Sequence, residues 1–256
     1  MARIAPLFEG WPVYLFRTVL DGEMGEAYAT DNDAAAVLCL PEFSFLAGDA
    51  SCADAEALAA IVPEGAVCDM RYWAPRDEAW ARVIERALDG KARMTQRYAI
   101  RKDVHRFDVA RLNALTRALP PDCELRAIDG PLYHMALSQG WSCDLVAKFR
   151  DEADFLTRGL GVVALSGGEI VSGASSFVVF RGGIEVEIDT RRDQRRRGLA
   201  AACGAQLLLT CFSRGLYPSW DAHNTASVAL AEKLGYVPGR PYDVYEADGG
   251  ADAASQ

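Results

Sequence analysis

One stretch of the sequence constrains the possible fold more than any other feature. Residues 161–190 read GVVALSGGEIVSGASSFVVFRGGIEVEIDT, a segment rich in Val, Ile and Phe that Gly-Gly pairs interrupt twice. Such residues favour strands, and paired glycines favour the tight turns of hairpins. The pattern therefore predicts three consecutive antiparallel strands.

The segments on either side alternate between extended and helical patterns. Before the three strands we expect a strand over 123–129 and helical stretches over 131–137 and 144–159. After them we expect a helix over 197–214, a strand near 217–223, a helix over 225–234 and a strand near 241–246. Gly215 and Gly235 directly follow the two helices, where glycine commonly ends a helix. These elements predict a mixed α/β domain over 121–248, followed by a disordered tail over 249–256.

The first 120 residues form a second predicted α/β domain. Their patterns follow the order hairpin, strand, helix, strand, helix, strand, which is also the order of the C-terminal half. We interpret this as a degenerate internal repeat, with a helix and linker over 107–123 between the halves. No cluster of arginine and glycine follows the strand ending FSFLAGD (43–49), so we do not expect this half to bind the ligand of the other half.

Composition excludes several functional classes. Half of the 256 residues are apolar and a quarter are charged, as in soluble globular proteins. The net charge of −9 argues against general binding to nucleic acid. No apolar run approaches the roughly 20 residues that cross a bilayer. Seven cysteines without a C-x-x-C pair predict reduced thiols in a cytoplasmic protein, and three scattered histidines give no support for a metal site.

The most distinctive motif follows the third predicted strand. Residues 191–204 read RRDQRRRGLAAACG, and Arg195, Gly198 and Ala200 match the spacing [Q/R]-x-x-G-x-[G/A]. At the start of a helix the first N–H groups have no partners within the helix, and the helix dipole adds positive potential. Turn amides, a glycine without Cβ and flanking guanidinium groups can therefore hold a phosphate. The alternative is a solvated basic loop.

Two familiar phosphate-binding loops are absent from the sequence. It contains neither G-x-x-x-x-G-K-[ST] nor G-x-G-x-x-G with an acidic residue about 20 positions later. A phosphate on the arginine–glycine turn would therefore belong to a different class of ligand.

Residues 182–237 resemble the cofactor-binding core of the Gcn5-related N-acetyltransferase (GNAT) superfamily. More narrowly, they resemble the branch that includes the zwittermicin-resistance enzyme, in which E-x-x-I-D-T and R-x-K-G-L-A precede P-x-W-D-x-x-N-x-x-S-x-x-L-A-x-K-L-G-Y. The resemblance is close over about 184–236, looser back to about 121 and fainter in the N-terminal half. It implies a GNAT fold and a catalytic domain over 121–248, with an N-terminal half that is a degenerate GNAT-like copy.

The resemblance also implies where coenzyme A would bind. Its pyrophosphate would lie on the turn amides of Arg195, Arg196, Arg197, Gly198, Leu199 and Ala200. Its pantetheine arm would lie along the preceding strand and bond to the main chain of Val186, Ile188 and Thr190. Asn224 occupies the family's asparagine position and would contact the cofactor arm, with Ser227 as a second contact. Asn224 is also well placed to cap the following helix, and the two roles are compatible.

Acyl transfer to an amine needs a base, because an alkyl ammonium with a pKa near ~10.4 cannot attack a thioester. In IEVEIDT the acids Glu185, Glu187 and Asp189 alternate with apolar residues and share one face of the strand. Either Glu185 or Glu187 is our predicted general base. The alternatives are structural ion pairing, with Arg181 or Arg191, or simple exposure to water.

The general acid is where this sequence departs from the resemblance. Many superfamily members carry a tyrosine shortly before E-K-x-G-F, and here Ala231 stands at that position. Either another group, such as Tyr236, Tyr242 or Tyr245, protonates the departing thiolate, or the thiolate leaves unassisted.

These inferences predict an acetyl-CoA-dependent N-acetyltransferase that transfers acetyl directly to a small-molecule amine in a ternary complex. The alternatives are an acyltransferase with another donor or acceptor and a non-catalytic protein that binds coenzyme A. The sequence leaves the acceptor and the oligomeric state open.

Overall fold

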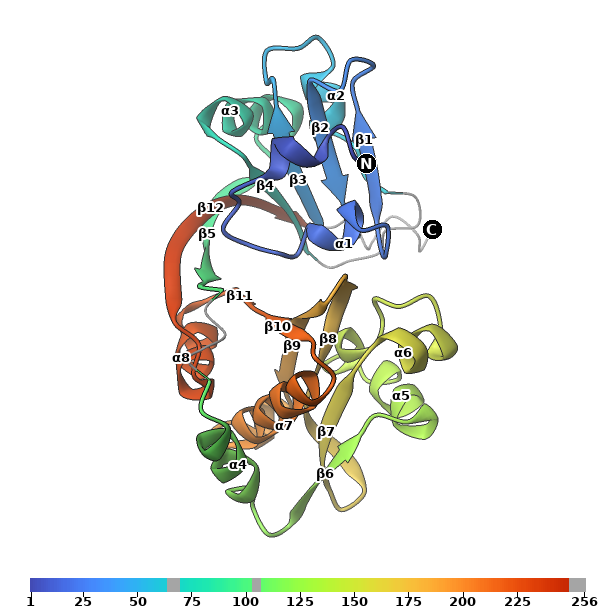
Figure 1. Cartoon of the computed structure of the whole chain (residues 1–256), viewed down its shortest axis with the longest axis vertical. Helices are drawn as coiled ribbons and strands as arrows, with labels where there is room; N and C mark the ends of the chain where they lie inside the picture. The colour runs from blue at the N-terminus through green and yellow to red at the C-terminus, as the bar shows by residue number, and fades with distance from the viewer. Residues whose placement is uncertain (64–69, 103–106, 249–256) are drawn as a thin grey trace. The chain divides into compact units, whose positions relative to one another are not determined.

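The computed structural model describes residues 1–63, 70–102 and 107–248 (Figure 1). The predicted tail and Cys68 lie outside these residues. The chain forms two compact units. We call residues 1–99 with 240–256 the N-terminal unit, and residues 100–239 the C-terminal unit.

The N-terminal unit is a mixed sheet with short helices. Its strands follow one another in the order β1-β2-β3-β4-β12-β5. Their bounds are Glu26–Ala29 (β1), Ala35–Cys39 (β2), Phe43–Gly48 (β3), Met70–Pro75 (β4), Arg93–Ile100 (β5) and Pro238–Asp248 (β12). The helical segments are Ala5–Phe8 (η1), Arg17–Leu20 (α1), Ala55–Ala59 (α2) and Glu78–Ala87 (α3). The predicted order of hairpin, strand, helix, strand, helix and strand is confirmed by β1–β2, β3, α2, β4, α3 and β5. The short segments η1 and α1 carry no pattern that we recognised in the sequence.

The largest of the buried side chains that pack helix α3 against the sheet of this unit is Trp80. Asp77 begins the helix by accepting from the backbone N–H groups of Ala79 and Trp80. The Trp80 side chain is fully buried, and its Nε1 donates to the carbonyl oxygen of Gly48 at 2.9 Å. The buried indole thus fills the core and keeps its one polar atom satisfied.

The C-terminal unit contains a five-stranded sheet in the order β10-β9-β8-β7-β6. Its strands are Cys123–Ala127 (β6), Gly161–Ser166 (β7), Glu169–Phe180 (β8), Gly183–Thr190 (β9) and Tyr217–Ser219 (β10), with Asp221–Ala222 as β11. Its helical segments are Val109–Arg117 (α4), Gly130–Leu137 (α5), Cys143–Leu145 (η3), Glu152–Arg158 (α6), Arg192–Gln194 (η4), Leu199–Ser213 (α7) and Thr225–Leu234 (α8). Strands β7, β8 and β9 are consecutive and antiparallel, as residues 161–190 predict, and β10 runs parallel to β9.

Helix α7 packs against β7, β8 and β9, and α4 packs against α7. Small residues at the start of α7 permit this close approach. A Cβ on Gly204 would lie 2.8 Å from Leu234 Cδ1 and 2.9 Å from Ile188 Cδ1, closer than carbon atoms normally pack. The small-residue run therefore sets the distance between this helix and the strand that precedes it.

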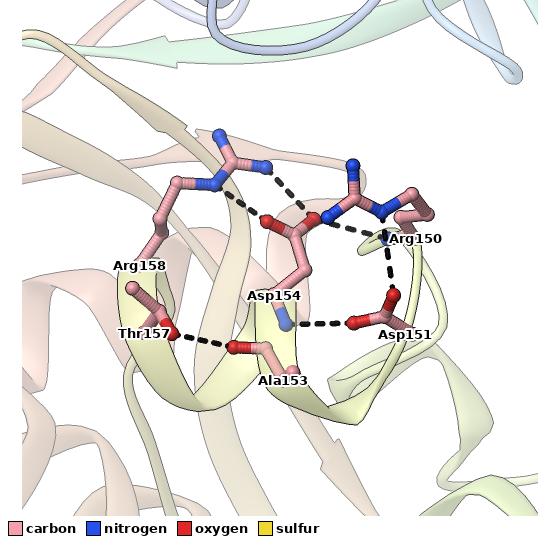
Figure 2. Close-up of polar contacts among 6 residues, drawn as sticks. All are labelled: Arg150, Asp151, Ala153, Asp154, Thr157 and Arg158. Carbon is pink, nitrogen blue, oxygen red and sulfur yellow. Dashed lines mark hydrogen bonds and ion pairs between the residues drawn. The ribbon is translucent and has the colours of Figure 1, made fainter.

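The helical stretch predicted over 144–159 forms two separate elements, η3 and α6. Asp151 caps α6 by accepting from the backbone N–H of Asp154 at 2.8 Å (Figure 2). The Asp154 carboxylate accepts from Arg158 Nε and Nη2 at 2.7 and 2.8 Å, and also from the backbone N–H of Arg150. A carboxylate at Asp154 thus links the loop before the helix to its last turn.

The boundaries of the compact units fall after residues 99 and 239, whereas the predicted domain boundary falls after residue 120. Helix α4, predicted as part of a linker, packs on α7 within the C-terminal unit. The end of β12, predicted within the C-terminal domain, pairs antiparallel with β4 instead, with Tyr245 opposite Trp73. The sequence patterns predicted helix α4 and strand β12, but not which unit each of them packs in.

No helix among the described residues is long and apolar enough to cross a membrane. The six cysteines that the structure describes are free thiols, and Cys39, Cys203 and Cys211 among them are buried.

Candidate active site

Strand β9 carries the predicted base. Its three acids differ in exposure: Glu185 is buried with 3% of its surface exposed, whereas Glu187 and Asp189 are half-buried. The exposed face expected for a solvated acidic strand is therefore not observed. The acids lie along a strand that enters the interior of the unit at Glu185.

Strands β9 and β10 pair over only a short distance. Tyr217–Ser219 lie beside Gly183–Glu185, and β9 then continues to Thr190 after β10 has ended. We call this point, where Ser219 faces Glu185, the fork. Beyond the fork, the Ile188 N–H donates to Oε1 of Glu187 at 3.1 Å, and the Thr190 carbonyl accepts from Arg195 Nε at 3.3 Å. Side chains thus bond main-chain groups that a neighbouring strand would otherwise take.

The arginine–glycine turn begins helix α7 in an unusual way. Gly198 is the N-cap residue with φ +82°, and Arg196 before it also has a positive φ of +63°. Gly198 carries no side chain to bond the first N–H groups of the helix, so these face outward from the turn. A Cβ on Gly198 would meet nothing within 4 Å. Leu199 is buried and anchors the helix, while Ala200 is half-buried.

The arginines of this turn divide into two groups. Arg197 Nη2 donates to both carboxylate oxygens of Asp122 at 2.7 and 2.8 Å, and its Nη1 bonds Gln194. Arg195 and Arg196 are exposed on the turn. Arg197 is therefore engaged in holding the start of β6, and Arg195 and Arg196 supply most of the outward positive charge.

Asn224 and Ser227 lie together at the start of α8. The Asn224 side chain caps the helix by accepting from the backbone N–H of Ser227 at 2.9 Å. The Ser227 hydroxyl accepts from Trp220 Nε1 at 3.1 Å. The capping role expected of Asn224 is confirmed, and its proposed contact with a cofactor stays a prediction.

Asp189 lies in an environment that disfavours its charge. Burial, followed by repulsion from Asp144 of η3, raises the pKa of its carboxyl to about 6, and Arg195 opposes this only in part. Asp144 itself accepts from Lys148 Nζ at 2.9 Å. Two carboxylates thus approach each other where η3 packs beside β9.

Sequence reasoning missed one charged residue at the fork. Lys102 Nζ donates to Oγ of Ser219 at 2.9 Å. The negative charges of Glu185 and Asp221 attract this ammonium group and favour its protonated form. Burial lowers the pKa of Lys102 despite these two acids. Lys102 lies in no recognisable motif and is 117 positions from Ser219. No sequence signal could have placed it beside β10.

The tyrosines expected to replace the missing general acid have other contacts. The Tyr236 hydroxyl donates to the Pro218 carbonyl at 2.8 Å, and burial raises its pKa well above the usual value, which makes it a weaker acid. The Tyr245 hydroxyl donates to Glu85 within the N-terminal unit, to which Tyr242 also belongs. These contacts do not favour Tyr236 or Tyr245 as the proton donor.

Comparisons with known proteins identify the family of the chain. The GNAT acetyltransferase family model matches residues 5–245. The chain belongs to this family.

Individual relatives differ widely in how much of the chain they match. The uncharacterized N-acetyltransferase YdfB of Bacillus subtilis (strain 168) is 33% identical over 95 residues, which span 36% of this chain and 36% of YdfB. A crystal structure of a GCN5-related N-acetyltransferase-like protein from Streptococcus suis 89/1591 is 41% identical, with a TM-score of 0.85 over 96% of this chain and 97% of that one. A GCN5-related N-acetyltransferase from Kribbella flavida shares 14% identity and a TM-score of 0.55, over 91% of this chain and 93% of that one, which shows similarity of fold alone.

Proposed function

We propose that this protein transfers the acetyl group of acetyl-CoA to a primary amine of a small molecule, directly and within a ternary complex. The observation that carries the proposal is the open fork of β9 and β10, which continues into the uncapped, glycine-initiated start of α7. A thioester cofactor has an extended amide-containing arm and a diphosphate. Such a molecule complements a free strand edge followed by a cluster of helix N–H groups.

In this proposal the diphosphate contacts the turn amides from Arg195 to Ala200. Exposed Arg195 and Arg196 add charge, whereas Arg197 acts mainly through its pairing with Asp122. The open space beside Gly198 supports a close approach of phosphate to the backbone. The amide-containing arm follows the edge of β9 at Val186, Ile188 and Thr190.

The arm and Glu187 would compete for one donor. The Ile188 N–H is bonded to the Glu187 carboxylate. An arm that took this N–H would release Glu187 from the strand edge. Glu185, at the fork, and Glu187, just beyond it, both remain candidates for the base that deprotonates the amine.

The acceptor is proposed to be a small, cationic amine. The acids of β9 and the nearby Asp144 give this part of the unit a negative character that suits a positively charged substrate. The resemblance of residues 184–236 to the branch that includes the zwittermicin-resistance enzyme supports a small-molecule acceptor.

We propose further that the N-terminal unit is a degenerate copy that does not bind coenzyme A. In support, β3 and β4 are parallel strands separated by α2, as β9 and β10 are separated by α7. The turn after β3 differs, however. A Cβ on Gly48 would lie 2.2 Å from the Ala34 carbonyl oxygen, so the chain itself fills the space that is open beside Gly198.

A pair of matched glycine variants tests the cofactor site. Gly198 and Gly215 lie at opposite ends of α7 and have φ of +82° and +68°, and a Cβ added to either would meet nothing within 4 Å. Substitution by alanine forces a left-handed backbone on each and should cost about 1–2 kcal/mol of stability. Only Gly198→Ala should also weaken acetyl-CoA binding, by about tenfold or more in calorimetry, because its methyl group would occupy the place of the phosphate.

Equal affinities of Gly198→Ala and Gly215→Ala for acetyl-CoA would contradict this placement of the diphosphate. Turnover is tested separately, by incubating the protein with acetyl-CoA and a panel of amines and measuring free thiol. Binding without thiol release for any amine would instead favour a non-catalytic coenzyme A-binding protein.

A further inference from the structure

The missing tyrosine leaves the departing thiolate without an obvious proton donor. Ala231 stands at its position in the sequence, and the hydroxyl of Tyr236 donates to a backbone carbonyl. A replacement would have to lie near the fork, where the proposed function brings thioester and amine together. It would also have to carry a proton that it can release.

Lys102 meets both requirements. Its ammonium group bonds to Oγ of Ser219, the last residue of β10, and Ser219 is the residue that faces Glu185 across the fork. Ser219 is completely buried and Lys102 is half-buried, so solvent screens this group only in part. The position of Lys102 is thus fixed at the point where β9 and β10 separate.

The charges around Lys102 explain why it is held there. Glu185 of β9 and Asp221 of β11 both act on the ammonium group. Glu185 is almost completely buried, and a buried carboxylate requires a compensating charge or hydrogen bonds. The charge of Glu185 also raises the pKa of Tyr236, but the Tyr236 hydroxyl donates its hydrogen bond to the Pro218 carbonyl. Lys102 therefore supplies positive charge at the fork.

We propose that Lys102 is the general acid of the reaction and that Lys102 and Glu185 work as one acid–base couple. This inference rests on the proposed function. The cationic acceptor first loses one proton to solvent through Glu185. The neutral amine nitrogen then forms a bond to the acetyl carbonyl carbon and gives a second proton to the Glu185 carboxylate. The carbon–sulfur bond then breaks, and the thiolate of coenzyme A takes a proton from the Lys102 ammonium.

The couple restores itself after each turnover. At that stage Glu185 is a neutral acid and Lys102 a neutral amine, and transfer of one proton between them returns the starting charges. The net reaction converts the ammonium form of the acceptor and acetyl thioester into amide, free thiol and one proton. Burial, which lowers the pKa of Lys102 below that of a free lysine, makes it a better donor to a thiolate.

Three variants test whether Lys102 donates a proton or only supplies a positive charge that holds the structure. Lys102→Met removes both charge and proton, whereas Lys102→Arg keeps the charge but cannot release a proton near neutral pH. Lys233→Met, at an exposed position in the last turn of α8, is the matched control. All four proteins are compared in acetyl-CoA affinity, in thermal unfolding and in kcat as a function of pH.

We expect kcat to fall on the order of 10²-fold in both Lys102 variants, with acetyl-CoA affinity within about threefold of wild type. In the wild-type protein kcat should decrease at high pH as Lys102 loses its proton, and this decrease should be absent from Lys102→Met. Lys233→Met should match wild type throughout.

Activity of Lys102→Arg close to wild type would overturn the proposal, because charge alone would then suffice. The proposal would also be overturned if kcat of Lys102→Met still decreased at high pH as it does in wild type. If Lys102→Met does not fold, the comparison of Lys102→Arg with wild type still decides. A wild-type protein that neither binds nor cleaves acetyl-CoA would refute the proposed function itself, before any variant is compared.

Discussion

Removing the charge of Asp189 should stabilise this protein at neutral pH. Asp189 lies near the end of β9, half-buried and facing the repulsion of Asp144, so its ionised form is less favourable in the folded chain than in the unfolded chain. The Asp189→Asn variant keeps the size of the side chain and cannot ionise. It therefore removes the unfavourable charge and leaves the strand in place.

The magnitude follows from the pKa. The carboxyl titrates near 3.8 when unfolded and at about 6 when folded, and each pKa unit corresponds to 1.36 kcal/mol. The folded state therefore gains up to about 3 kcal/mol from protonation of Asp189. Because the folded pKa is the higher one, this stabilisation is fully present below pH 3.8 and is lost as the pH rises through about 6. At pH 7 we expect Asp189→Asn to be about 1–3 kcal/mol more stable than wild type, and near pH 4 the two should differ little.

Urea unfolding at pH 4, 5, 6 and 7 measures this difference. Asp154→Asn serves as a control of opposite sign, because hydrogen bonds from Arg158 lower the pKa of Asp154 and its charge stabilises the folded state (Figure 2). That variant should be less stable than wild type throughout pH 4–7, and its deficit should shrink only below about pH 3.8. An Asp189→Asn variant that is no more stable than wild type at pH 7, or equally stabilised at pH 4, would refute the reasoning.

Two further predictions concern residues at the start of α8 and within α7. Asn224→Ala should lose about 1 kcal/mol of stability because it removes the helix cap, while Asn224→Asp should keep the cap and normal urea unfolding. If the Asn224 amide also contacts the cofactor, Asn224→Asp will bind acetyl-CoA more weakly in calorimetry despite its normal stability, and unchanged affinity would limit Asn224 to capping. In the same unfolding assay, Gly204→Ala should lose up to about 2 kcal/mol if the methyl groups of Leu234 and Ile188 cannot move aside, because its own methyl group would lie within 3 Å of both. A gain of about 1 kcal/mol, the helix-propensity difference, would show that those two side chains give way.

Much of the secondary structure was predictable because its signals are local. The Gly-Gly pairs and β-branched runs of residues 161–190 specify three antiparallel strands, and all three form as expected. The strand–glycine–helix junction at Gly198 was likewise recognisable from its spacing, and the structure places the glycine at the N-cap with the positive φ that its lack of Cβ permits.

The assignment of elements to compact units was less predictable. The sequence of β12 predicts a strand but does not say which strand it pairs with. Its partners in β4 lie 170 or more positions earlier in the chain. The same holds for helix α4: its amphipathic pattern predicts that one face is buried, but does not identify α7 as the helix that buries it.

The sequence by itself determined the family, the strand and helix order around β9 and the position of the turn that we expect to hold a diphosphate. Each of these depends on neighbouring residues, and neighbouring residues are what a sequence motif records. Only the tertiary structure decided the electrostatics of the site: that Glu185 is buried, that Asp144 raises the pKa of Asp189, and that Lys102 reaches Ser219. Charge interactions depend on distance and burial in three dimensions, and residues far apart in the chain meet only when the fold brings them together.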